Sequence, residues 1–146
     1  MMKRLMVGFA LVVASSLSAQ ELRDRTLVSW AAVDDLSVVG GSVLTVENGD
    51  RFDALVYGEL AKGRFMLGSD RFSRSVRAQQ DWPQEKTSGA FVQVAATYAD
   101  KSRTVTLYRD GAAYASYQID EKNRFVVDTD RQMPKLTGVA VEGTGR

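Results

Sequence analysis

Three acidic side chains lie close together in the sequence, and a pair of them could in principle hydrolyse a glycosidic bond. They are Glu47, Asp53 and Glu59. A retaining hydrolase needs its two carboxyl groups about 5 Å apart on one face of the fold. The Asn48-Gly49 pair predicts a tight turn directly after Glu47, which leaves Glu47 at a hairpin end and Glu59 beyond the far end of the next strand. The spacing therefore predicts solvated acids near turns and no catalytic pair.

Histidine and cysteine are both absent from the sequence. Their absence excludes metal sites built from these residues and catalytic triads that depend on histidine. Calcium, which takes six or more oxygen ligands, is an open alternative at the turn that contains Glu47, Asn48 and Asp50. Asp34 and Asp35 supply oxygens at another turn. Neither turn brings together more than three such side chains, so no motif requires a cofactor.

A polar stretch from residue 69 to 89 combines the groups that sugar recognition uses. Trp82 could stack on the apolar face of a sugar ring, while planar polar side chains bind its hydroxyl groups. The polar side chains of this stretch that are candidates for ligand binding are Asp70, Arg71, Arg74, Gln80 and Asp81. Loops longer than about 15 residues are uncommon in a compact domain and are often functional. The alternative is that Trp82 packs and that the arginines, which recur at 71, 74 and 77, cover a solvated loop.

The elements that must position these candidates are short strands. Apolar residues come in bursts separated by Gly, Asn, Asp and Ser, and no window repeats them with a helical period. The sequence therefore predicts an all-β domain with strands at 26–32, 41–47, 51–58, 64–68, 91–98, 104–109, 112–119 and 125–127. Two-residue turns at Asn48-Gly49 and Asp110-Gly111 are expected to close two hairpins, because these residues accept the positive φ of a type I′ turn.

The second hairpin also predicts how the strands pack. If Arg109 faces Ala112 across the turn, then Leu107 faces Tyr114, and neither side of the hairpin is wholly polar. Two packed sheets explain this pattern better than one sheet with a solvated side. Trp30 lies in a predicted strand and is expected in the core.

The first 19 residues are typical of a secretory signal peptide. Lys3 and Arg4 precede an apolar stretch from 5 to about 14, which small residues follow. The stretch is shorter than the ~20 apolar residues of a spanning helix. We therefore expect cleavage near residue 19, export to the periplasm or beyond, and a domain at 20–146 without a membrane span. Loss of the two basic residues changes the net charge from +1 to −1, so nucleic-acid binding has no electrostatic support.

Two segments resemble a known family. The stretch FVQVAATYADKSRTVTLYRDGAAYASYQI resembles the central strands of laminin-G-like, concanavalin A-like jelly-roll domains, through V-A-x-T-Y and V-x-L-Y-x-[DN]-G patterns. Residues 26–70 are similar to the laminin-G-like domain that accompanies secreted bacterial family 32 glycoside hydrolases of the levanase and invertase type. The resemblance implies a two-sheet antiparallel jelly-roll sandwich over about 26–127. The tail at 128–146 does not resemble the closing strands, so the fold is expected to be incomplete or completed by residues 136–141.

These observations predict an exported module that is not an enzyme. The resemblance implies a carbohydrate-binding or accessory role in the degradation of a polysaccharide of the fructan type, with a glycan, another domain or a protein as partner. One alternative is a structural or adhesion domain that packs against a protein without binding sugar. A more remote alternative is a fragment of a glycoside hydrolase, although the E-x-D-x-x-E strand of glucanases and the W-x-N-D-P type of nucleophile motif are absent.

Overall fold

The computed structural model describes residues 21–77, 80–128 and 135–138. The strands are β1 Glu21–Leu22, β2 Arg25–Ala31, β3 Ser42–Asn48, β4 Arg51–Tyr57, β5 Phe65–Ser69, β6 Val92–Ala99, β7 Thr104–Arg109, β8 Ala112–Gln118, β9 Val127–Asp128 and β10 Lys135–Gly138, and two 3₁₀ turns, η1 Asp70–Phe72 and η2 Glu121–Asn123, connect some of them. The predicted signal peptide at 1–19 lies outside these residues, so export stays a prediction. No helix in the described ranges is long and apolar enough to cross a membrane.

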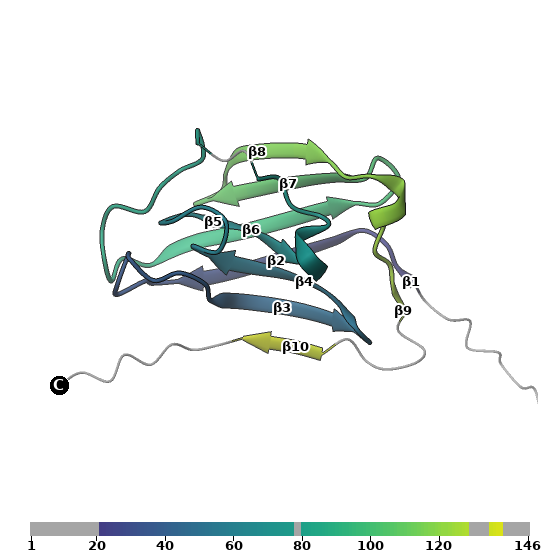
Figure 1. Cartoon of the computed structure of the whole chain (residues 1–146), viewed down its shortest axis with the longest axis horizontal. Helices are drawn as coiled ribbons and strands as arrows, with labels where there is room; N and C mark the ends of the chain where they lie inside the picture. The colour runs from purple at the N-terminus through teal and green to yellow at the C-terminus, as the bar shows by residue number, and fades with distance from the viewer. Residues whose placement is uncertain (1–20, 78–79, 129–134, 139–146) are drawn as a thin grey trace, which may run out of the picture.

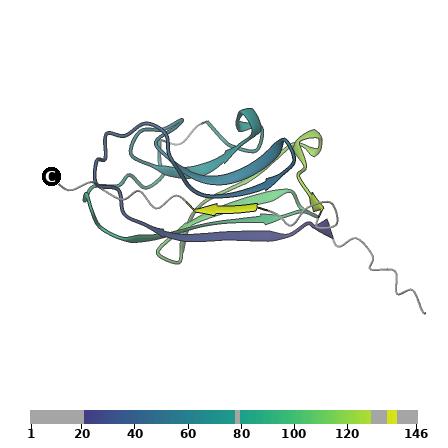
Figure 2. The same cartoon turned by 90° about the horizontal axis from the view of Figure 1, so that it is seen from below.

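Two four-stranded antiparallel sheets pack face to face (Figures 1 and 2). One sheet has the order β10-β3-β4-β5 and the other the order β2-β6-β7-β8, while β1 and β9 form a separate short pair. The arrangement confirms the predicted all-β antiparallel sandwich. Its jelly-roll connectivity stays a prediction. Part of the tail does add a strand, because β10 pairs with β3 from Lys135 opposite Glu47 to Gly138 opposite Leu44; residues 139–141 lie outside the described ranges.

Alternation along the strands divides the apolar side chains between two clusters. The main core lies between the sheets and includes Leu27, Val94 and Leu107 from one sheet and Leu55 and Phe65 from the other. A second cluster of Ala54, Val56 and Met66 lies on the opposite face of β4 and β5, where Phe52, Leu60, Phe72 and Trp82 cover it. Phe72 and Trp82 belong to the segment after β5, which therefore covers part of the outer face of its own sheet (Figure 2).

The two predicted hairpin turns differ in how closely they follow the sequence pattern. The Asp110-Gly111 turn has positive φ at both residues, 49° and 78°, which confirms the type I′ prediction. The first hairpin turn is displaced by one residue, because Asn48 pairs with Arg51 and the turn consists of Gly49-Asp50. Only the glycine of that turn has a positive φ, 63°, which fits a type II′ turn with glycine at its first central position.

A β-bulge corrects the register predicted for the second hairpin. The pair beside the turn forms as predicted, but Leu107 pairs with Ala115 and not with Tyr114. The extra residue lets both Tyr114 and Ala115 pack against the main core. The Tyr114 hydroxyl donates a hydrogen bond to the Phe65 carbonyl oxygen of the opposite sheet, at 3.1 Å. The bulge thus adds a polar contact between the two layers.

Candidate functional site

Trp82 does not form the exposed platform that the polar stretch predicts. Its half-buried ring stacks on Tyr117, with ring centroids 6.2 Å apart and planes 12° apart, and meets Tyr114 edge-on at 5.8 Å. Its carbonyl oxygen accepts a hydrogen bond from Arg64 Nε at 3.1 Å. Burial raises the pKa of both tyrosine hydroxyls. Trp82 is therefore a packing residue, which covers the side of the sandwich between the edge strands β5 and β8.

The side chain of Arg74, which the sequence predicts as a ligand contact, is fully buried. Arg74 Nε donates to Asp53 Oδ1 at 2.6 Å. Its Nη2 donates to the Phe52 carbonyl oxygen at 2.6 Å and to Asp70 Oδ2 at 3.1 Å. A guanidinium group held by these partners inside the protein cannot meet a ligand from solvent.

The other residues predicted with Trp82 do not share one environment. Asp70 accepts hydrogen bonds from the Phe52 N–H at 2.7 Å and from Arg51 Nε at 3.2 Å. Burial raises the pKa of Asp70, but the Phe52 hydrogen bond and the Arg74 charge outweigh it and hold that pKa below its usual range. The exposed members of the set are Arg71, Gln80 and Asp81. The predicted set therefore combines network members, a packing ring and exposed polar groups, and does not form one ligand surface.

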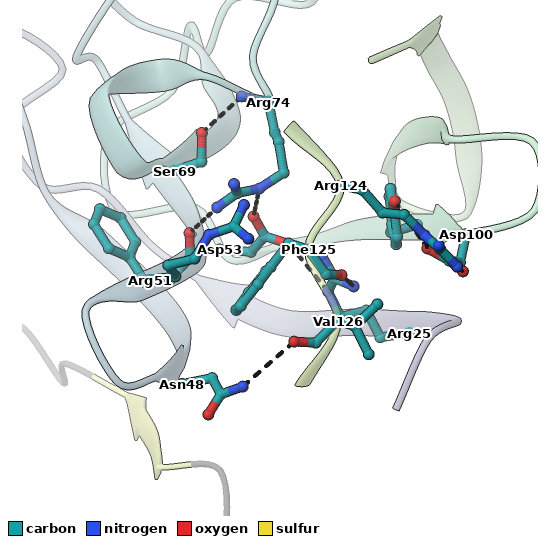
Figure 3. A network of polar contacts seen from close by, with 12 residues as sticks. Arg25, Asn48, Arg51, Asp53, Ser69, Arg74, Asp100, Arg124, Phe125 and Val126 are labelled. Atoms are coloured by element: carbon teal, nitrogen blue, oxygen red, sulfur yellow. Dashed lines mark hydrogen bonds and ion pairs between the residues drawn. The ribbon is translucent and has the colours of Figure 1, made fainter. Parts of the chain in front are cut away.

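Of the three residues predicted as calcium ligands, one already forms a hydrogen bond within the protein and another lies on a strand. Asn48 Nδ2 donates to the Val126 carbonyl oxygen at 3.3 Å (Figure 3). Glu47 lies on β3 opposite Phe52, and Asp50 is exposed in the displaced turn. The described part of the chain contains no group of three or more acidic residues that could hold a metal ion. Calcium binding at this turn stays a prediction.

A buried ion-pair network lies between the sheets (Figure 3). Asp53, predicted as a solvated acid, is only 2% exposed. Arg25 on β2 donates to Asp53 Oδ2 through Nε, at 3.0 Å, and through Nη2, while Arg74 occupies Oδ1. Both guanidinium groups lie over the Phe125 ring, with Cζ 4.8 Å and 4.7 Å from its centroid. All of these groups are partnered, so the network joins the two layers rather than forming a reactive site.

Two small depressions lie near Phe65 and Glu85 in the part of the chain that the structure describes. Both are lined by Phe65 and Glu85 and enclose about 160 Å³ each, part of which is open to solvent. Glu85 is buried and bound by Arg109 through two hydrogen bonds, 2.8 Å and 2.9 Å long. Ligand pockets usually measure about 300–1,000 Å³. Neither depression is therefore a good candidate for a ligand site.

The outer face of the sheet β2-β6-β7-β8 combines an exposed tryptophan with uncharged side chains on all four strands. Trp30, predicted in the core, is 63% exposed on this face. The residues that point outward from the four strands are Thr26, Val28, Trp30, Gln93, Ala95, Thr97, Ala99, Thr104, Thr106, Tyr108, Ala113, Ser116 and Gln118. None is charged, although 25% of all residues in the chain are. No described segment covers this face (Figure 2), and we call it the open face.

The register arranges the open face in rows that cross the strands. The aromatic row contains Trp30 opposite Gln93, with Phe91 just before β6 at the same end of the sheet and 78% exposed. The middle row consists of Val28, Ala95, Tyr108 and Ala113. The hydroxyl row consists of Thr26, Thr97, Thr106 and Ser116.

The chain matches no family model, and no curated protein matches it. The resemblance to laminin-G-like domains therefore rests on the sequence patterns alone. The chemistry of the open face is the main basis for an argument about function.

Proposed function

We propose that the chain is an exported, non-catalytic domain that binds an uncharged polysaccharide on the open face. The observation that carries this proposal is the charge-free surface on which Trp30 is exposed. Sugar rings present apolar C–H faces that stack on aromatic rings, and their hydroxyl groups bond to the hydroxyl and amide groups of Thr, Ser and Gln. A charged ligand would find no counter-charge in the three rows.

The hydroxyl row favours a sugar over a protein partner. A surface that packs against another protein is expected to carry a broad apolar patch. On the open face, the apolar side chains of the aromatic and middle rows are bordered by the hydroxyl row, which begins at Thr26 on β2 and crosses all four strands. The resemblance to accessory domains of family 32 glycoside hydrolases makes fructans the first polysaccharides to test.

Affinity electrophoresis tests the proposal. The purified chain is run through gels that contain soluble neutral polysaccharides, a linear fructan first, and through gels that contain an acidic polysaccharide. We expect retardation in neutral gels only. Trp30→Ala should weaken binding by about 30-fold, since aromatic anchors at binding surfaces commonly contribute ~2 kcal/mol or more.

Val39→Ala is the matched control, because Val39 is 71% exposed but lies in the loop between β2 and β3. It should bind like the wild type, and both variants should keep the melting temperature within a few degrees. If no neutral gel retards the wild type, or if Trp30→Ala is retarded equally, the protein-packing alternative replaces this proposal.

A further inference from the structure

We propose that the ligand on the open face is a linear, uncharged polymer that lies across the strands along the middle row. This inference rests on the proposed function and adds the direction and the length of the bound segment. A polymer in this position has the hydroxyl row along one side on all four strands, and the aromatic row beside it on the other side at β2 and β6.

The direction follows from the register. Residues paired across strands lie side by side, and the hydroxyl row keeps one chemistry from β2 to β8, whereas the chemistry changes along β2. Thr26, Val28 and Trp30 illustrate this change along β2. A polymer whose successive units present the same hydroxyl groups matches the hydroxyl row when it runs across the strands. Along one strand it would meet a ring, a methyl group and a hydroxyl in turn.

The hydroxyl row keeps bonding capacity for a ligand. Thr106 Oγ1 and Ser116 Oγ lie 3.2 Å apart, and Thr97 Oγ1 donates to the Thr106 carbonyl oxygen at 3.4 Å. A hydroxyl group offers one donor and two acceptor sites, so these contacts fix its orientation without using all of its sites. The row can therefore bond to successive units of one chain.

The size of the sheet sets the length of the bound segment. Adjacent strands lie about 4.8 Å apart, so the outer two of four strands are separated by about 14 Å. A polymer whose repeating unit spans about one such spacing places one unit over each strand, so the sheet contacts about four consecutive units. Since β2 and β8 are the edge strands of this sheet, both ends of the middle row are open, and an internal segment of a long chain fits as well as its end.

The decisive variant is Ala113→Leu. Ala113 is exposed in the middle row on β8, the strand farthest from Trp30. A leucine there obstructs a polymer that crosses the sheet but not one that stays near β2. Its matched control is Ala112→Leu, because Ala112 is also exposed but pairs with Arg109 on the other side of β8. We expect Ala113→Leu to weaken binding of a linear fructan or linear β-glucan by about tenfold and Ala112→Leu to leave it unchanged.

Oligosaccharides of the same polymers provide a second measurement. Competition should strengthen with length up to about four units and then level off, and the monosaccharide should not compete. If Ala113→Leu is unstable by thermal denaturation, Ser116→Ala replaces it, because it removes one hydroxyl from the same strand.

The outcomes separate this inference from the proposed function. Wild-type affinity in Ala113→Leu, together with loss in Trp30→Ala, overturns the crossing direction and leaves the carbohydrate function standing. Binding of the monosaccharide as tight as that of the polymer also overturns it. If the wild type binds no polysaccharide and instead self-associates in a way that Trp30→Ala abolishes, both proposals fail.

Discussion

Replacing Asp53 with asparagine tests the buried network directly. Asparagine keeps the shape of the side chain but has only one acceptor oxygen, and its amide group donates hydrogen bonds. In the wild type, Asp53 Oδ1 accepts from Arg74 and Oδ2 from Arg25. In Asp53→Asn, one arginine faces a donor, and two buried cations lose the charge that balances them.

The expected loss of stability is large. Removing one partner from a buried ion pair typically costs about 3–5 kcal/mol, and Asp53 and Arg74 are both almost completely excluded from solvent. A domain of this size has a total stability of roughly 5–15 kcal/mol. The variant should therefore melt roughly 10–20 °C below the wild type.

Urea denaturation followed by tryptophan fluorescence measures the loss, and thermal denaturation followed by circular dichroism provides an independent probe. Asp81→Asn is the control, because Asp81 is exposed and its substitution should change stability by less than about 0.5 kcal/mol. If Asp53→Asn unfolds within about 1 kcal/mol of the wild type, the network contributes no net stability, and the reasoning from its burial is wrong.

Three further predictions concern the turn, the packing ring and the response to acid. Gly111→Val should lose about 1 kcal/mol or more by backbone strain, because Gly111 has φ +78 with open space around it, whereas Gly41→Val, also in open space but without a positive φ, should lose less in the same melting experiment. Trp82→Ala should lose about 2–4 kcal/mol in urea denaturation, since the ring contacts both apolar clusters, and Trp82→Phe should recover part of it. The hydrogen bond from Arg124 holds the pKa of Asp100 below its usual range against the opposing effect of burial, so this contribution to stability is complete above the unfolded pKa of about 3.9 and is lost as the pH falls through the lower folded value. Urea midpoints measured between pH 7 and pH 3 should therefore fall more steeply for the wild type than for Asp100→Asn, and parallel curves would contradict this assignment.

The strands could be predicted because their signals are local. Alternation and turn residues act within a few positions of each other, and each predicted strand overlaps an observed one. The Asp110-Gly111 turn likewise depends on two neighbouring residues. The displaced Gly49-Asp50 turn shows the limit of this reasoning, since Asn48-Gly49 and Gly49-Asp50 are both acceptable turn pairs and only the pairing of the flanking strands distinguishes them.

The site residues could not be predicted in the same way. Alternation along β2 separates Leu27 from Trp30, but it does not say which side faces the other sheet. Trp82 looked exposed because its sequence neighbours are polar, yet Tyr114 and Tyr117 from β8 surround it. Trp30 is therefore exposed and Trp82 is packed, the reverse of the environments that the sequence predicts.

The buried network also limits how early the chain can fold during its synthesis. Asp53 bonds to Arg25 across 28 positions and to Arg74 across 21, and Arg25 Nη1 donates to the Phe125 carbonyl oxygen across 100 positions. Contacts so distant in sequence carry a high loop-closure cost before they contribute any stability. A chain that has emerged only as far as β8 still lacks the ring and the carbonyl oxygen of Phe125 that complete the arginine environment. Folding of this domain is therefore expected to be a late, cooperative event, in which the two sheets pack together only after residue 125 has been synthesised.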